Sequence, residues 1–107
     1  MSDYVLVTTT TDSVDEAQQL AMSAVEARLA ACAQVSAPIT STYWWEGVVE
    51  ASTEYRIDFK TTADQAERLG QHLRATHSYD VPEVIYVPIL GGNPAYLAWI
   101  SKETAQP

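Results

Sequence analysis

Residues 32–62 alternate between apolar and polar side chains with a period of two, which predicts two half-buried β-strands. Glu46-Gly47 interrupts the alternation, so the segment is expected to form one hairpin. A two-residue turn at Glu46-Gly47 would set apolar side chains opposite polar ones, whereas a shift of one residue sets apolar opposite apolar. The shifted register is therefore predicted, with Glu46 to Val48 as a three-residue connection and these pairs: Trp45 with Val49, Tyr43 with Ala51, Ile39 with Tyr55, and Val35 with Phe59.

The predicted hairpin is long for the size of the chain. Strands of about 13 residues extend roughly 40 Å, whereas a compact domain of this length has a diameter of about 30 to 35 Å. The hairpin must therefore bend over its own core or project beyond it. Its tip carries Tyr43, Trp44 and Trp45, which would favour aggregation if left uncovered. We expect an arm that packs on another subunit; a hairpin curled over its own core is the alternative.

Before the hairpin, the pattern predicts a strand and a helix. The apolar, β-branched run within residues 3–11 is typical of a central strand. Ser13 and Glu16 have the spacing of a capping box, and an alanine-rich apolar stripe continues to about Ala31. The helix is expected to lie close against the sheet because its buried side chains are small.

After the hairpin, a second capping-box pattern at Thr62 begins an amphipathic helix that reaches about His77. An apolar strand follows at residues 83–87, and Asn93-Pro94 begins a short C-terminal helix. The order of elements is that of an α+β, ferredoxin-like split βαβ sandwich in one domain, residues 1–107. Its helices would leave one face of the sheet uncovered, which is a second reason to expect oligomerisation.

Composition narrows the classes of function. The chain has 107 residues, 47% of them hydrophobic and 19% charged, as expected of one soluble globular domain. The net charge of −8 argues against binding to nucleic acid or to anionic membranes. Cys32 is the single cysteine, the N-terminal segment carries an acid rather than the basic residues of a signal peptide, and no apolar run approaches 18 residues. A cytoplasmic protein is expected.

Several short motifs occur in order along nearly the whole chain: Ala30-Ala31-Cys32, Tyr43-Trp44-Trp45-Glu46-Gly47, Lys60-Thr61-Thr62, Val81-Pro82-Glu83 and Gly91-Gly92-Asn93-Pro94-Ala95-Tyr96-Leu97. In combination they closely resemble the CutA family of divalent-cation-tolerance proteins. The resemblance implies a homotrimer of ferredoxin-like subunits with interlocking hairpins, similar in arrangement to PII-type signalling trimers. It also implies a role in the response to metal ions, with copper(II) or another divalent metal as the ligand.

The chain departs from the usual family pattern at two places. It has His77-Ser78-Tyr79-Asp80 where family members often have His-Pro-Tyr-Glu, which retains the histidine, the tyrosine and an acid. Val48 replaces the basic residue that many members have after Glu-Gly, and this removes a charge from the hairpin tip.

Cys32 and His77 are the candidate metal ligands. Cys32 offers a soft thiolate donor for copper, and His77 matches the family's histidine. The alternatives are structural: a small buried hydrophobe for Cys32 and a favourable charge at a helix C-terminus for His77. One chain supplies no converging donor set, so a site is expected at a subunit interface. His72 is expected to be solvated.

Trp44, Lys60, Tyr79 and Glu83 form a second candidate set, for a small anionic ligand in an inter-subunit cleft. Trp44 and Lys60 share the polar parity of the hairpin, and a tryptophan there needs a covering partner or ligand. An ion pair between Lys60 and Glu83 is the structural alternative. No nucleophile–base motif has a recognised spacing, and Gly91-Gly92-Asn93-Pro94 lacks the lysine of a P-loop, so catalysis is not expected.

Overall fold

The computed structural model describes residues 2–105 of the chain. It contains five strands and three helices, in this order: β1 (Tyr4–Thr11), α1 (Val14–Glu26), β2 (Cys32–Val35), β3 (Ile39–Trp45), β4 (Val48–Thr62), α2 (Ala63–Thr76), β5 (Ile85–Ile89) and α3 (Pro94–Thr104).

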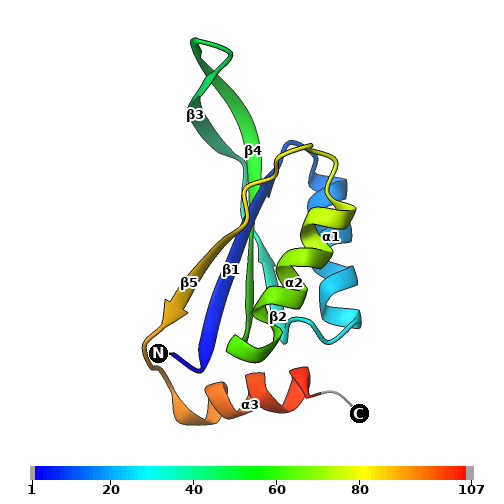
Figure 1. Ribbon diagram of the computed structural model, residues 1–107, viewed down its shortest axis with the longest axis vertical. Helices are drawn as coiled ribbons and strands as arrows, with labels where there is room; N and C mark the ends of the chain where they lie inside the picture. The colour runs from blue at the N-terminus through cyan, green and yellow to red at the C-terminus, as the bar shows by residue number, and fades with distance from the viewer. Residues whose placement is uncertain (1, 106–107) are drawn as a thin grey trace.

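The strands form an antiparallel sheet in the order β2-β4-β1-β5, and β3 pairs with the remaining part of β4. Helices α1 and α2 cover one face, whereas α3 crosses the lower end of the sheet (Figure 1). The predicted α+β, ferredoxin-like order is confirmed, including the central position of the first strand.

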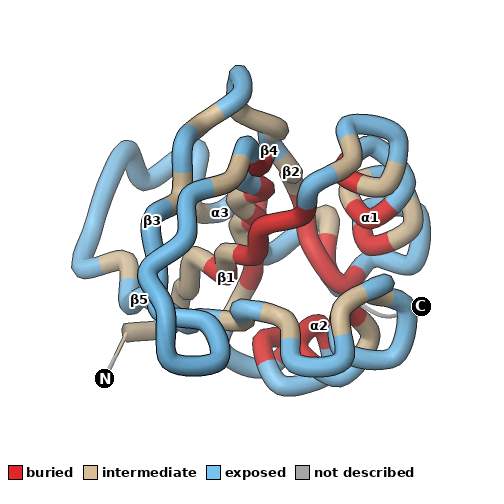
Figure 2. Tube along the Cα trace, turned by 90° about the horizontal axis from the view of Figure 1, so that it is seen from above, coloured by how far each residue is buried: buried red, intermediate tan, exposed pale blue. Residues whose placement is uncertain are grey.

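The hydrophobic core lies between the sheet and the two long helices. Buried positions concentrate in β1, the lower part of β4 and the facing sides of α1 and α2 (Figure 2). Ala17 and Ala24 of α1 are completely buried in this core, so small side chains of α1 face the sheet. The main core residues are Val7, Ala17, Leu20, Ala24, Ile57, Phe59, Ala66, Leu69 and Leu73.

The predicted register of the hairpin is wrong. Trp45 pairs with Val48 and Tyr43 with Glu50, so the connection is the two-residue turn Glu46-Gly47. Both turn residues have positive φ, 47° and 83°, as in the type I′ turns whose twist matches two-residue hairpins. Side chains at the tip are exposed on both faces, so burial does not select an apolar-opposite-apolar ladder and the turn sets the register.

A second register change separates β2 from β3. Val35 pairs with Ile57 rather than Phe59, and Ile39 pairs with Glu54 rather than Tyr55. The segment 36–38 therefore holds one more residue than the part of β4 opposite it, which is a bulge. Pro38 lies in this break, where a strand has no need of a backbone donor.

One helix end and one helix cap differ from the sequence expectation. Helix α1 ends at Glu26 rather than Ala31, because Arg28 adopts a left-handed φ of 61° and redirects the chain. Ser13 and Asn93 cap their helices by accepting backbone N–H bonds from Glu16 and Ala95, as predicted. Thr62 precedes α2 without a side-chain cap bond, so the predicted capping box is absent there.

Thr9 carries a buried hydroxyl without a hydrogen-bond partner in the described part of the chain. Valine has nearly the same shape and no hydroxyl to desolvate, so Thr9→Val is expected to raise the free energy of unfolding by about 1 to 2 kcal/mol. Urea denaturation checks this. Thr8→Val is the matched control: its hydroxyl donates to the Ile57 carbonyl, so the same gain in both variants would contradict the explanation.

The upper part of the hairpin projects beyond the rest of the molecule, which makes the longest dimension 44 Å (Figure 1). The expectation that it overhangs is confirmed. We call residues 39–53 the arm. Its tip exposes five large apolar side chains: Tyr43, Trp44, Trp45, Val48 and Val49.

Among the described residues, no helix is long and apolar enough to cross a membrane.

Candidate functional site

Cys32 and Lys60 lie side by side on the sheet face opposite α1 and α2. They are direct partners on β2 and β4. Ile57, Phe59 and Thr61 are fully buried on the helix side, so the alternate residues of β4, including Lys60, point to the other face. We call this face the open face.

The Lys60 ammonium is held by neutral groups. Its Nζ donates a hydrogen bond to Gln34 Oε1 at 2.7 Å and lies 5.8 Å from the centre of the Tyr96 ring, within range of a cation–π contact. Glu83 is exposed in the loop before β5. The described carboxylates, Glu83 included, make no ion pair with Lys60, so the proposed Lys60–Glu83 pair does not form within one subunit.

His77 follows α2 and uses both ring nitrogens. Nε2 donates to the Thr10 carbonyl at 2.8 Å, and Nδ1 accepts from the Tyr79 backbone N–H at 3.0 Å. A carbonyl only accepts and an amide N–H only donates, so the neutral Nε2–H tautomer satisfies both contacts. Metal binding by His77 requires one of these hydrogen bonds to break.

Tyr79 connects this loop to the base of the arm. Its hydroxyl donates to Glu54 Oε2 at 2.9 Å, and its ring centre lies 4.7 Å from that of His77. Burial, the bond to Glu54 and the nearby carboxylates of Asp12 and Glu16 raise the pKa of Tyr79 well above its ordinary value. Tyr79 is therefore a neutral donor that holds the buried Glu54.

Glu16 anchors the same loop to the start of α1. Its carboxylate accepts hydrogen bonds from Ser78 N and Ser78 Oγ, both at 2.8 Å, and another from Thr11 Oγ1. Burial by itself would raise the pKa of Glu16, but these hydrogen bonds to the charged carboxylate lower the pKa below its ordinary value. The charged carboxylate is thus favoured in the folded protein.

This pKa shift predicts a stability loss in acid. A carboxylate with a lowered folded-state pKa stabilises the protein above its unfolded value, near 4.5, and that contribution is lost as pH falls through the folded value. The free energy of unfolding should therefore fall below about pH 4.5, and less steeply in Glu16→Gln. Urea titrations at stepped pH measure both slopes. Glu26→Gln is the control, and the same slope in Glu16→Gln as in the unmodified protein would contradict the assignment.

The two candidate metal ligands are well separated within one subunit. Cys32 and Leu6 both pair with Lys60, so Leu6 marks the level of Cys32 in the sheet. His77 bonds to the Thr10 carbonyl, and Thr10 lies four residues, or about 13 Å, further along β1 than Leu6. Two ligands of one metal ion lie within about 4.5 Å of each other. Residues 2–105 contain no group of three or more His, Cys, Asp or Glu side chains placed to hold a metal ion.

The four candidate residues for an anionic ligand are also separated. Trp44 is 74% exposed at the arm tip and pairs with Val49. Val49 and Lys60 lie near opposite ends of β4, roughly 36 Å apart at about 3.3 Å per residue. The sequence pattern predicted that Trp44 and Lys60 share one face of the hairpin. That prediction is wrong, because the observed register sets them on opposite faces of β4. One subunit therefore does not form this cleft.

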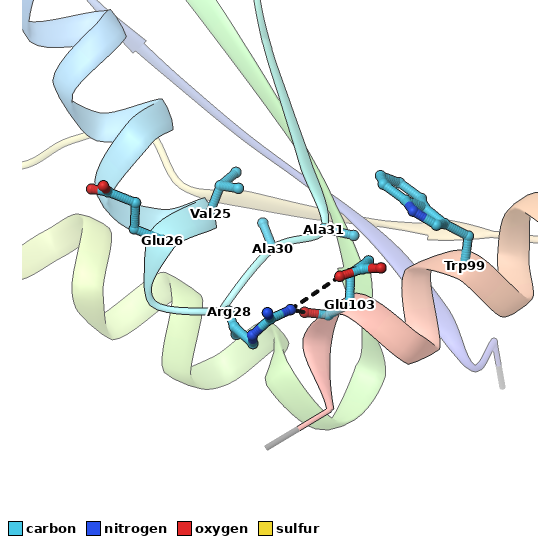
Figure 3. Close-up of a pocket in the computed structure, with 7 residues that line it drawn as sticks. All are labelled: Val25, Glu26, Arg28, Ala30, Ala31, Trp99 and Glu103. Carbon is cyan, nitrogen blue, oxygen red and sulfur yellow. Dashed lines mark hydrogen bonds and ion pairs between the residues drawn. The ribbon is translucent and has the colours of Figure 1, made fainter. Parts of the chain in front are cut away.

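A pocket that no sequence pattern indicated lies at the end of α1 against α3. It has a volume of about 300 Å³ and is lined by Val25, Glu26, Arg28, Ala30, Ala31, Trp99 and Glu103. Figure 3 shows Arg28 reaching Glu103, which it contacts at 3.1 Å.

His72 is not solvated as expected: it is half-buried and bonded to Ser23 Oγ at 2.9 Å.

Comparison with known proteins assigns the family. A family model described as "CutA1 divalent ion tolerance protein" matches residues 5–103, almost the whole described chain. The chain belongs to the CutA1 family. The resemblance found in the sequence motifs is thereby confirmed.

CutA proteins of bacteria and plants show the extent of the similarity. The divalent-cation tolerance protein CutA of Thermus thermophilus is 38% identical over 104 residues, 97% of this chain and 99% of its own length. The rice relative, "Protein CutA 1, chloroplastic", is 39% identical over 95% of this chain, but this chain spans only 58% of it. The solved structure of CutA from Synechococcus elongatus superposes with a TM-score of 0.93 at 39% identity, covering 98% of this chain and 93% of that one.

Proposed function

We propose that this CutA1-family chain acts in tolerance of divalent cations as a homotrimer that binds copper(II) or another divalent metal between its subunits. One observation carries the proposal: the chain exposes two separate apolar surfaces that a neighbour would cover. The first is the arm tip, and the second surrounds β5 on the open face and its flanks, with Val81, Ile85, Val87 and Leu90.

The separation of these two surfaces favours a ring. A two-fold dimer pairs one patch with itself, whereas two different patches suit a head-to-tail contact that closes into a ring. The arm tip of one subunit would cover the β5 surface of the next. Native mass spectrometry tests this, with three times the chain mass as the expected result and the single chain mass at micromolar concentration as the contrary one.

The metal would need donors from two subunits. Within one chain the donors do not fit a divalent ion, because Cys32 and His77 are too far apart and both nitrogens of His77 are engaged. A trimer would supply copies of each donor at every seam. The proposal therefore rests on assembly first and on metal binding second.

Equilibrium dialysis of tag-free protein tests the metal. Cu²⁺ is the first probe, and Zn²⁺ is the second because it has no redox chemistry with the thiol. Saturable binding that is lost in Cys32→Ser and His77→Gln but kept in His72→Gln supports the site. Binding that survives both substitutions, or that is no tighter than to an unrelated acidic protein, overturns it.

A second candidate function is a PII-like scaffold that binds a small anion between subunits. Lys60 favours it, because this half-buried cation contacts Gln34 and Tyr96 but none of the described carboxylates. Trp44, Tyr79 and Glu83 would come from the neighbouring subunit or its arm. Thermal-shift measurements with a panel of anionic metabolites test this, since a ligand of the native state raises the melting temperature. A rise that persists in Lys60→Met would contradict the assignment.

We propose a cytoplasmic location because a single cysteine, which can form no internal disulfide, suits a reducing compartment. The rice relative carries the word chloroplastic in its name, so compartments differ within the family. Fractionation of native cells with an antibody to the chain checks the assignment. Neither proposal includes a catalytic step.

A further inference from the structure

Strand β4 changes character at Glu54. From Val48 to Thr53 its side chains are exposed, apart from the half-buried Ser52, whereas Ile57, Phe59 and Thr61 further along are completely buried. Figure 2 shows the same division: the arm is exposed or half-buried and has no buried position, and the buried positions begin where β4 enters the sheet. One continuous strand thus belongs to two different environments.

Three other boundaries coincide with this one. Pairing with β1 ends at Tyr55, the partner of Thr11. The strand on the other side of β4 is broken at residues 36–38, where the register changes by one residue. The Tyr79 hydroxyl donates a hydrogen bond to Glu54 at 2.9 Å, and Glu54 is the last buried residue of β4 before the arm. Beyond it, β3 and β4 pair only with each other.

The arm has little to stabilise it alone. A two-stranded ribbon is marginally stable in water at best, because the entropy lost on ordering its backbone is not offset by burial. Its turn places Glu46, a non-glycine residue, at a φ of 47°, which L-residues adopt only at a cost. None of the side chains in residues 40–53 is buried. The rest of the sheet, by contrast, has a core of its own with α1 and α2.

We infer that the arm is unfolded in the lone subunit and folds only when a second copy of the chain covers it. This inference rests on the proposed homotrimer and adds an order of events: the core forms first, and the arm is ordered during assembly. The folded arm then belongs to the assembled state. A lone subunit would carry a flexible, aromatic-rich segment that other chains or proteases can reach.

Pulse-labelling hydrogen exchange during refolding tests this on the full, unmodified chain. Samples refold at two protein concentrations that differ tenfold, and peptides covering residues 55–62 are compared with peptides covering residues 39–53. The core peptides should gain protection at one rate at both concentrations. The arm peptides should gain it later, and about tenfold faster at the higher concentration, because subunit association depends on concentration. Equal, concentration-independent rates for both sets overturn the inference.

A pair of variants gives an equilibrium version of the test. Val87→Asp introduces a charge on the open face, and Val14→Asp makes the same change on the helix side at nearly equal exposure, 42% and 40%. In Val87→Asp the core peptides should stay protected while the arm loses protection; in Val14→Asp both should stay protected. An arm still protected in a single-chain Val87→Asp protein overturns the inference, and if that variant fails to fold, the refolding experiment decides.

The mass of the native protein separates the two failures. If the unmodified protein has the mass of one chain, the homotrimer fails; unprotected arm amides in that protein would still support the inference, and protected ones would overturn it. If the protein is a trimer whose arm folds with the core, the inference alone fails.

Discussion

Val87→Asp is expected to convert the proposed homotrimer into single subunits. Val87 lies on the open face of β5 and is 42% exposed in the lone chain, so the subunit can fold with a charge there. A neighbour covering this surface would bury the carboxylate without a partner, at a cost of about 3 kcal/mol or more, which weakens association about 100-fold or more. Sedimentation velocity at micromolar concentration measures the change.

Val14→Asp is the control for this prediction. It introduces the same charge at a similarly exposed valine, but at the first turn of α1, where an acid suits the helix dipole. Its assembly should match that of the unmodified protein. If Val87→Asp retains the assembled mass, the open face is not the interface and the head-to-tail ring is wrong.

The order of elements was predictable because its signals are local. Ser13 and Asn93 cap helices through bonds to residues two or three positions away, and the alternation of β4 is carried by its own sequence. The motifs around Tyr43 to Gly47 and Gly91 to Leu97 identify the family for a related reason: each is a short contiguous run.

The register of the hairpin was not predictable from burial, because the rule assumes that one face of the hairpin is covered by its own chain. At the arm both faces are exposed, so the turn at Glu46-Gly47 decides instead. The contacts at the base of the arm were missed for another reason. Tyr79 and Glu54 are distant in sequence, and only the folded chain brings the hydroxyl to the carboxylate.

The candidate sites could likewise be predicted only in part from the sequence. Cys32 and Lys60 are neighbours because β2 and β4 pair in the observed register; the predicted register would have set Cys32 opposite Thr62 instead. His77 and Trp44 do not join them in one subunit, since the first is held by Thr10 and the second lies at the arm tip. A sequence gives the donors of an inter-subunit site, whereas the symmetry of the assembly decides which of them meet.

Phe59→Ala is expected to lower the free energy of unfolding by about 3 to 5 kcal/mol. Phe59 is fully buried between Val7 on β1 and Ala33 on β2, so its removal leaves a cavity in the centre of the core. Small domains are stable by about 5 to 15 kcal/mol, so the loss is a large part of the total. Equilibrium denaturation should show it at every protein concentration, because the core belongs to each subunit alone.

Trp44→Ala removes an aromatic side chain from the other end of the same hairpin and serves as the comparison. Trp44 is 74% exposed, so its loss should cost the lone subunit no more than about 0.5 kcal/mol. If a neighbouring subunit covers the arm, the cost instead falls on association. Trp44→Ala should then separate into single subunits on dilution at concentrations where Phe59→Ala remains assembled, and its denaturation midpoint stops depending on concentration there. Denaturation curves over a hundredfold range of concentration distinguish the two behaviours. A Trp44→Ala protein with an unchanged midpoint at every concentration would show that no subunit rests on the arm tip.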